Sequence, residues 1–175
     1  MIELLRTRRS IRKYTEQPVE PEKLEILKEA VLRSPSSKGI NPWKFIFIDD
    51  VETIQKLKLC KPTGTSPLDT APLAVVFCAD ETVNDAWIED SSIAAIILQL
   101  TAHSLGLGSC WIHAHFRMYN ETVTSEKYIQ DLLGIPAHFK VLCAVSVGYP
   151  LKRAKGRPFE ELQFEKIRIN RFYTD

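Results

Sequence analysis

Apolar and polar residues follow two different periods along the chain, so helical and strand patterns are interleaved. Helical spacing of apolar residues, together with start and stop signals, predicts helices near residues 2–5, 21–34, 51–59, 93–105 and 124–133. Apolar runs rich in β-branched and aromatic residues predict strands at residues 43–48, 73–78, 109–114 and 141–147. This order predicts an α+β or α/β domain with at least four strands.

Two segments define the expected centre of that domain. Residues 73–78 are apolar at every position, which indicates a central strand covered on both faces. The next helix carries apolar residues at the spacing of a core-facing stripe, at Ile93, Ile96, Ile97 and Leu100. Because alanines and Leu98 fill its other faces, we expect this helix to be buried nearly all round.

Composition narrows the class of protein without naming a function. The chain has 175 residues, a formal charge of +1, 45% hydrophobic residues and 26% charged residues. These values exclude a disordered polyelectrolyte, a fibrous repeat and a multi-pass membrane protein. We therefore expect one domain over residues 1–175, large enough to bury a core without metal or disulfide crosslinks.

The cysteines and the N-terminus predict a cytoplasmic protein. The four cysteines are scattered, with neither a C-x-x-C pair nor a framework spacing. The first ten residues lack the apolar core of a secretory signal. The most apolar stretch, residues 93–107, is too short to span a bilayer and contains Gln99 and His103.

No standard catalytic motif is present. The chain lacks a P-loop, a G-x-G-x-x-G fingerprint, a G-x-S-x-G elbow and an H-E-x-x-H pair. His113 and His115 could share one face of a strand as half of a zinc site, but no third ligand is evident. Cys110 and His113 are three positions apart in that strand, so we expect them on opposite faces.

Two basic clusters are the strongest chemical signal. The first contains Arg6, Arg8, Arg9, Arg12 and Lys13 around Ser10, and the second contains Lys152, Arg153, Lys155 and Arg157. Guanidinium groups match phosphate oxygens, and a near-neutral chain favours focused anion binding over a polyanion partner. A solvated basic face and a nucleic-acid arm remain alternatives at this point.

Two loops add polar groups that could contact a ligand. Residues 34–43 concentrate hydroxyls, an amide and a glycine ahead of a strand, which suits a heteroaromatic ring. Residues 106–111 place two glycines where backbone could approach a ligand. Each loop also has a structural interpretation, as a turn-rich connection and as a helix C-cap respectively.

Taken in order, these segments resemble the nitroreductase family. The resemblance rests on R-R-S-I-R-K-Y at 8–14, S-P-S-S at 34–37 with N-P-W at 41–43, G-L-G-S-C-W at 106–111 and G-Y-P at 148–150. It covers the chain from Leu4 to about Pro158. It implies an α+β fold of the three-layer α/β/α type, with a mostly antiparallel sheet and a buried core helix. It also implies a homodimer that binds FMN at the subunit interface.

The resemblance also implies which residues hold FMN. The basic motif would bind the phosphate and ribityl chain, through Arg8, Arg9, Ser10 and Arg12. The serine loop would contact the isoalloxazine ring, often from the other subunit, through Pro35, Ser36, Ser37 and Asn41. The glycine motif would approach the flavin at Gly108 and Ser109. A basic residue after G-Y-P would complete the phosphate site, with Lys152 and Arg153 chosen over Lys155 and Arg157.

The implied activity is hydride transfer from NADH or NADPH through FMN N5 to an electron-poor acceptor such as a nitroaromatic or quinone, with ping-pong kinetics. No catalytic side chain and no metal are expected, because the flavin carries the redox chemistry. The alternatives are a non-catalytic FMN-binding protein and a family variant that acts on enones or halogenated aromatics. The apolar tail, about residues 159–175, is expected to wrap the partner subunit.

Overall fold

A four-stranded antiparallel sheet forms the middle layer of the protein in the computed structural model, which describes residues 1–172. Its strand order is β1–β2–β4–β3, and every neighbouring pair is antiparallel. The strands span Trp43–Ile48 (β1), Leu73–Asp80 (β2), Gly108–His113 (β3) and Phe139–Gly148 (β4). The predicted central strand is confirmed, because β2 lies between two others and is buried along nearly its whole length.

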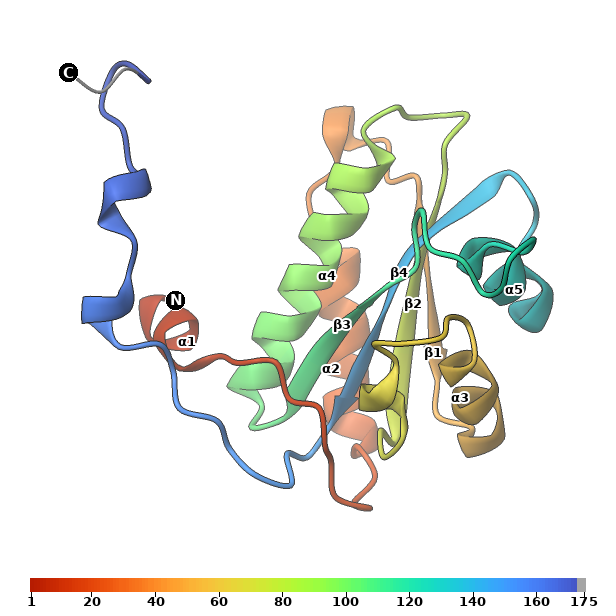
Figure 1. The fold of residues 1–175 in the computed structure, drawn as a ribbon, viewed down its shortest axis with the longest axis horizontal. Coiled ribbons are helices and arrows are strands. Elements are labelled where there is room, and N and C mark those ends of the chain that lie inside the picture. The colour runs from red at the N-terminus through yellow and green to blue at the C-terminus, as the bar shows by residue number, and fades with distance from the viewer. Residues whose placement is uncertain (173–175) are drawn as a thin grey trace.

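Helices cover both faces of this sheet (Figure 1). One face packs against α2 (Pro21–Leu32) and α4 (Trp87–Ser104), and the other against α3 (Val51–Lys58) and α5 (Ser125–Leu133). The short α1 (Ile2–Thr7) contacts α4. The predicted three-layer α/β/α arrangement is therefore confirmed. Within residues 1–172, none of the helices combines the length and apolar character needed to cross a membrane.

Local signals in the sequence explain where several helices begin and end. Pro21 occupies the first turn of α2, where its missing N–H costs nothing. Asp50 accepts a hydrogen bond from the Thr53 N–H at 2.7 Å at the start of α3. Gly134 ends α5 in the left-handed region at φ +66°. Because these signals are local, the predicted limits of the three helices agree closely with the structure.

The predicted core face of the central helix is wrong. α4 begins at Trp87, before the expected start, and Ile93 and Ile96 are each 39% exposed. The buried side is lined instead by Ala94, Ala95, Leu98 and Ala102. Small alanines let the helix lie close to the sheet, and this leaves the larger isoleucines on the opposite side. The helix is therefore half covered in the single chain rather than buried all round.

The two ends of the chain run together along one side of the body. After α1, the segment of residues 8–14, here called the arginine arm, pairs with the outer edge of β3 through the Ile11 N–H and the Ser109 carbonyl at 2.9 Å. The C-terminal tail, here residues 154–172, forms two short 3₁₀ turns at Phe159–Glu161 and Phe164–Lys166 and then extends away from the sheet (Figure 1). The last three residues of the predicted wrapping tail lie outside the described residues.

Candidate functional site

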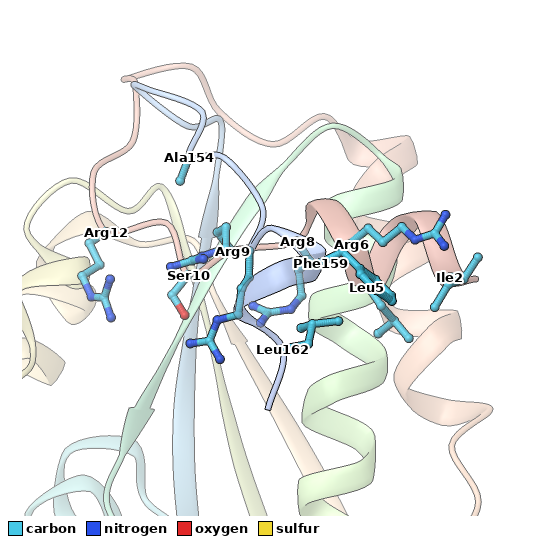
Figure 2. A pocket seen from close by; sticks show the side chains of 11 residues that line it. Ile2, Leu5, Arg6, Arg8, Arg9, Ser10, Arg12, Ala154, Phe159 and Leu162 are labelled. Carbon is cyan, nitrogen blue, oxygen red and sulfur yellow. The ribbon is translucent and has the colours of Figure 1, made fainter. Parts of the chain in front are cut away.

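A cavity of about 750 Å³ lies between α1, the arginine arm and the start of the tail (Figure 2). Its polar wall consists of Arg6, Arg8, Arg9, Ser10, Arg12 and Arg157. Its apolar wall consists of Ile2, Leu5, Ala154, Phe159 and Leu162. A cavity of this size, with apolar side chains on one wall and several polar side chains on the other, is suited to a small molecule.

Four of the five guanidinium groups of this cavity lack acidic partners in the described part of the chain. Arg6 pairs with Glu3, but Arg8, Arg9, Arg12 and Arg157 form no ion pair within residues 1–172. Uncompensated positive charge focused in a cleft attracts anions. Arginine forks also offer parallel N–H donors that match phosphate or carboxylate oxygens. The cavity is therefore chemically suited to an anionic ligand.

Close packing against β3 fixes the backbone of the arginine arm. Gly108 lies directly under Ile11, and a Cβ added at Gly108 would come within 2.5 Å of that side chain. The Tyr14 hydroxyl donates to the Ile11 carbonyl at 2.6 Å and contacts Ser146 Oγ at 2.8 Å. Burial raises the pKa of Tyr14, which keeps this hydroxyl protonated as a donor. The arm is thus held in place before any ligand binds.

The tail reaches the cavity by crossing α1 at very short range. A Cβ added at Gly156 would lie 1.8 Å from the Arg6 carbonyl oxygen, so only glycine fits this crossing. The crossing places Ala154 on one side and Arg157 on the other, and both line the cavity. Arg157 is therefore the residue of the second basic cluster that joins Arg8, Arg9, Ser10 and Arg12.

A smaller cavity of about 290 Å³ adjoins the first and shares Arg9 with it. It also contains Thr7, His103, Arg153 and Lys155. His103 Nε2 lies 2.8 Å from Thr7 Oγ1. Burial is the largest cause that lowers the pKa of His103, and the positive charges of Arg8 and Arg153 lower it further. The same positive potential therefore extends from the arginine arm to the end of α4.

The serine loop, residues 34–41, lies at the opposite end of α4. Ser36 Oγ donates to Asn41 Oδ1 at 2.7 Å and accepts from the Asn41 N–H at 2.9 Å, which closes the loop on itself. The Ser37 N–H donates to Asp90 in the first turn of α4 at 2.8 Å. Asp90 and His103 are separated by 13 residues of α4, about 20 Å at 1.5 Å per residue. The loop and the arm therefore do not meet within one chain.

The structure divides the predicted site residues into three groups. Arg8, Arg9, Ser10 and Arg12 line one cavity, as their motif predicts, whereas Arg153 lines the smaller cavity and Lys152 lines neither. Gly108 and Ser109 are buried beneath the arm and hold it in place. Pro35 and Asn41 are exposed, and Ser36 and Ser37 are half-buried, at the other end of α4.

The histidines and cysteines of the third strand do not assemble a second centre. His113 is the last residue of β3, whereas His115 lies beyond it with its ring edge against Trp87. Within residues 1–172, no three His, Cys, Asp or Glu side chains are arranged to hold a metal. Cys110 is buried, and burial raises the pKa of its thiol. This thiol is therefore poorly suited to act as a nucleophile.

Sequence reasoning misses part of the site. The apolar wall of the large cavity comes from α1 and from the tail, whose side chains carry no motif. In the sequence Asp90 indicates only the beginning of a helix, although it binds the serine loop across 53 positions of sequence. In the sequence, no local signal distinguishes Arg157 from Lys152, Arg153 and Lys155.

Comparisons with known proteins agree with this geometry. A model of the nitroreductase family matches residues 5–61 and 64–149. An FMN-dependent nitroreductase structure from Clostridium difficile R20291 is similar with a TM-score of 0.96 and 46% identity, and the match covers 98% of this chain and 100% of that one. The structural similarity therefore extends through both candidate regions.

Curated relatives point the same way. A protein of Archaeoglobus fulgidus, named provisionally as an NADH dehydrogenase/NAD(P)H nitroreductase, is 35% identical over 85% of this chain and 84% of its own length. An FMN reductase [NAD(P)H] of Bacillus subtilis is 31% identical over 90% of this chain and 69% of its own length. With the fold, the arginine arm and the family match in agreement, this chain belongs to the nitroreductase family.

Proposed function

We propose that this chain is an FMN-dependent oxidoreductase that transfers hydride from NADH or NADPH to an electron-poor acceptor, and that it works as a homodimer. The observation that carries the proposal is the cavity lined by Arg8, Arg9, Arg12 and Arg157, whose charges have no acidic partner in the described chain. The similarity to an FMN-dependent nitroreductase and to an FMN reductase supports FMN as the anionic ligand.

The cavity fits the polar end of FMN. A phosphate monoester carries close to two negative charges at neutral pH, which several guanidinium groups can offset. Arg8, Arg12 and Arg157 would hold the phosphate, and Ser10 would add a neutral hydroxyl donor. The apolar side chains of Leu5, Phe159 and Leu162 would shield these contacts from water, which strengthens them.

A homodimer would bring the two separated regions together. Along α4, between the serine loop and the arginine arm, Ile93 and Ile96 are each 39% exposed. A two-fold contact through this face would set the two α4 helices against each other, because such interfaces use the same patch twice. With the helices antiparallel, the loop of one subunit would lie near the arm of its partner. We infer that each flavin is held by the arm of one subunit and the serine loop of the other.

The tail supports the same arrangement. Its apolar side chains are exposed in the single chain, with Phe159 at 66%, Ile167 at 63% and Ile169 at 82%. The tail also extends away from the sheet rather than folding back onto it (Figure 1). Apolar side chains displayed on an extended segment favour docking onto another surface. We propose that this surface is the partner subunit.

The cofactor and the protein would have different roles in the reaction. When bound, FMN would supply the redox chemistry: hydride acceptance from a nicotinamide and electron donation to a nitroaromatic or quinone. The chain binds and orients the cofactor and surrounds it with fixed positive charge. Preorganised cations favour any state in which negative charge develops nearby. No side chain is assigned a proton-transfer role.

The visible absorption spectrum tests the proposal most simply. Purified protein is supplemented with FMN, desalted and then mixed anaerobically with NADH or NADPH. Retained flavin bands that bleach with either nucleotide are the expected result. Bands that persist would favour the non-catalytic FMN-binding alternative. Absent bands would contradict the proposal and return the arginine cavity to other anions, including nucleic acid, which a salt-dependent binding assay would detect.

Steady-state kinetics then test the order of the steps and the acceptor. Varying nucleotide at several acceptor concentrations should give parallel double-reciprocal lines. Intersecting lines would contradict the ping-pong mechanism. The acceptor panel contains a nitroaromatic, a quinone, an enone and a halogenated aromatic, and we expect the first two to be reduced fastest. Faster reduction of an enone or removal of halogen would assign the chain to a variant of the family.

A further inference from the structure

We propose that Asp90 is a positioning residue that fixes the serine loop to α4 in the conformation that contacts the flavin. The effect on flavin binding rests on the proposed function, because the serine loop is the predicted ring-binding segment. The anchoring of the loop rests on the contacts of Asp90 alone. Asp90 itself does not reach the proposed site, so it acts through the backbone of Ser37.

Asp90 is a buried carboxylate whose two oxygens have different partners. The residue is 2% exposed. Oδ1 accepts from the Ser37 N–H at 2.8 Å, and Oδ2 accepts from Asn84 Nδ2 at 2.7 Å. Asn84, 6% exposed, in turn accepts from the Ala86 N–H at 3.2 Å. A chain of three hydrogen bonds therefore joins the loop to the beginning of α4.

Apart from the hydrogen bond of the Ser34 N–H to the Val31 carbonyl at the end of α2, this contact is the hydrogen bond that ties the loop to another element. Within the described residues, every other hydrogen bond of residues 35–41 stays inside the loop, including those between Ser36 and Asn41. Without Asp90, the loop would be attached to the body through its two chain ends alone. Loss of this contact should therefore let the loop move.

The loop needs such an anchor because its backbone is strained. Lys38 and Asn41 both have φ of +54°, in the left-handed region, which asparagine tolerates but lysine seldom adopts. Such a conformation at Lys38 persists where surrounding contacts hold it in place. The Asp90 contact restrains Ser37, directly before Lys38, whereas the Ser36 hydroxyl restrains Asn41. The strained Lys38 is thus next to a residue that is hydrogen-bonded to α4.

The position of Asp90 suits a negatively charged acceptor. Both of its partners are donors, so the side chain needs no proton of its own. It lies in the first turn of α4, where the helix dipole favours negative charge. It also lies one turn before Ile93, on the helix that carries the proposed dimer face. The anchor therefore sets the position of the loop relative to the partner subunit as well as to its own chain.

Four variants separate this role from a general effect on folding. Asp90→Ala removes the anchor, and Glu89→Gln is the matched control, since Glu89 is an exposed carboxylate in the same helical turn. Asn84→Asp places two buried carboxylates together and should disrupt the pair. The double variant Asn84→Asp/Asp90→Asn exchanges the amide and the carboxylate. The amide now at position 90 can still accept from the Ser37 N–H and can donate to the carboxylate now at position 84.

Two measurements are made on each variant. Amide hydrogen exchange of residues 34–42 in the flavin-free protein reports on the loop independently of any cofactor. FMN titration by fluorescence quenching, at two salt concentrations, reports on binding. We expect Asp90→Ala to speed exchange of the Ser37 amide and to raise the FMN Kd about tenfold, the lower end of the roughly 10- to 100-fold effect of a hydrogen bond to a charged group. The salt dependence should not change, because the phosphate contacts are intact.

Rescue is the decisive comparison. The double variant should restore both slow exchange and FMN affinity to near the wild-type values, whereas Asn84→Asp alone should not. If Asp90→Ala does not fold, the Asn84→Asp and double variants make the same comparison. Unchanged loop exchange in Asp90→Ala, or faster exchange with unchanged FMN affinity, would overturn the proposal. A wild-type protein that binds no FMN would instead contradict the proposed function, while exchange alone would still test the anchor.

Discussion

The two ends of α4 differ in how their charged groups are satisfied. At the first end, Asp90 is buried and both of its oxygens are hydrogen-bonded within the chain. At the other end, Arg8 and Arg12 line an open cavity and form no ion pair in the described part of the protein. One end is complete in the single chain, and the other presents charge that only an added anion can balance.

This contrast explains how two distant segments can serve one ligand. A flavin has a polar phosphate end and a planar ring end, and these make different demands on a protein. In the proposed function, the arginine arm would attract the phosphate strongly but without selectivity. The serine loop would present a fixed arrangement of hydroxyl, amide and backbone groups to the ring. The exposed isoleucines between them would be the surface through which a second copy brings the two ends together.

The largest expected effect comes from breaking the surface between the two ends. The double variant Ile93→Glu/Ile96→Glu should produce a monomer at micromolar concentration, because an unpaired charge buried in an apolar interface costs several kcal/mol. FMN affinity should fall by more than about 100-fold at the same time. Sedimentation velocity measures the first effect and fluorescence titration the second.

The matched control for that variant is Val51→Glu. Val51 is a 65% exposed aliphatic residue on α3, on the opposite face of the sheet from α4. It should leave both the sedimentation coefficient and FMN binding unchanged. A dimer that survives Ile93→Glu/Ile96→Glu would place the subunit interface elsewhere.

The next effect comes from the arginine end. Arg8→Ala removes a charge-assisted hydrogen bond, worth roughly 1.5–3 kcal/mol, so the FMN Kd should rise about 10- to 100-fold. Binding should also become less dependent on salt. Lys152→Ala is the control, because Lys152 lines neither cavity. Equal losses of FMN affinity in Arg8→Ala and Lys152→Ala would indicate a general basic surface and would contradict a focused phosphate site.

A smaller effect is expected where the tail crosses α1. Gly156→Ala introduces a Cβ that would lie 1.8 Å from the Arg6 carbonyl oxygen, so the tail must shift. Overpacking of this kind typically costs about 1–3 kcal/mol. We expect FMN affinity to fall because Arg157 moves with the tail, while the far-UV circular dichroism stays unchanged. Wild-type affinity in Gly156→Ala would show that Arg157 does not contribute.

The smallest effect is a pH dependence at the arginine end. The lowered pKa of His103 means that the folded protein binds this proton less readily than the unfolded chain. The free energy of unfolding should therefore fall as pH decreases through about 6.5, which is the ordinary pKa of a histidine side chain. His103→Gln should make the free energy of unfolding depend less on pH. Some dependence should remain, since burial and Arg117 also lower the pKa of His113.

Urea unfolding of the flavin-free protein at neutral and mildly acidic pH measures the slope of this pH dependence. Adding FMN should weaken it, because a phosphate near Arg8 offsets the positive charge that disfavours protonation of His103. A slope in His103→Gln equal to that of the wild type would rule out His103 as a contributor.

Much of the fold could be predicted because its signals are local. The limits of β1 follow from the aromatic and β-branched run between Pro42 and Asp49, and α5 ends at a glycine in the left-handed region. The arginine arm could also be recognised from the sequence, since its four cations are close together in the chain. These features depend on neighbouring residues and not on the rest of the chain.

The remaining features depend on contacts between residues that are distant in the sequence. Helical spacing identified Ile93 and Ile96 as apolar but could not distinguish a core position from an exposed one, so the predicted burial in the chain was wrong. The contact between Ser37 and Asp90 and the crossing of Gly156 over α1 join segments that no local pattern relates. The spacing of the second basic cluster likewise did not reveal that Arg157 reaches the large cavity.

A subunit-mixing experiment tests the central claim most directly. Arg8→Ala disables the arm, and Ser36→Ala/Asn41→Ala disables the loop, so each homodimer should bind FMN weakly. Mixing equal amounts under conditions that exchange subunits should restore roughly a quarter of the wild-type binding sites, because half the dimers are mixed and each has one intact site. No recovery after confirmed exchange would show that the arm and the loop do not combine across the interface.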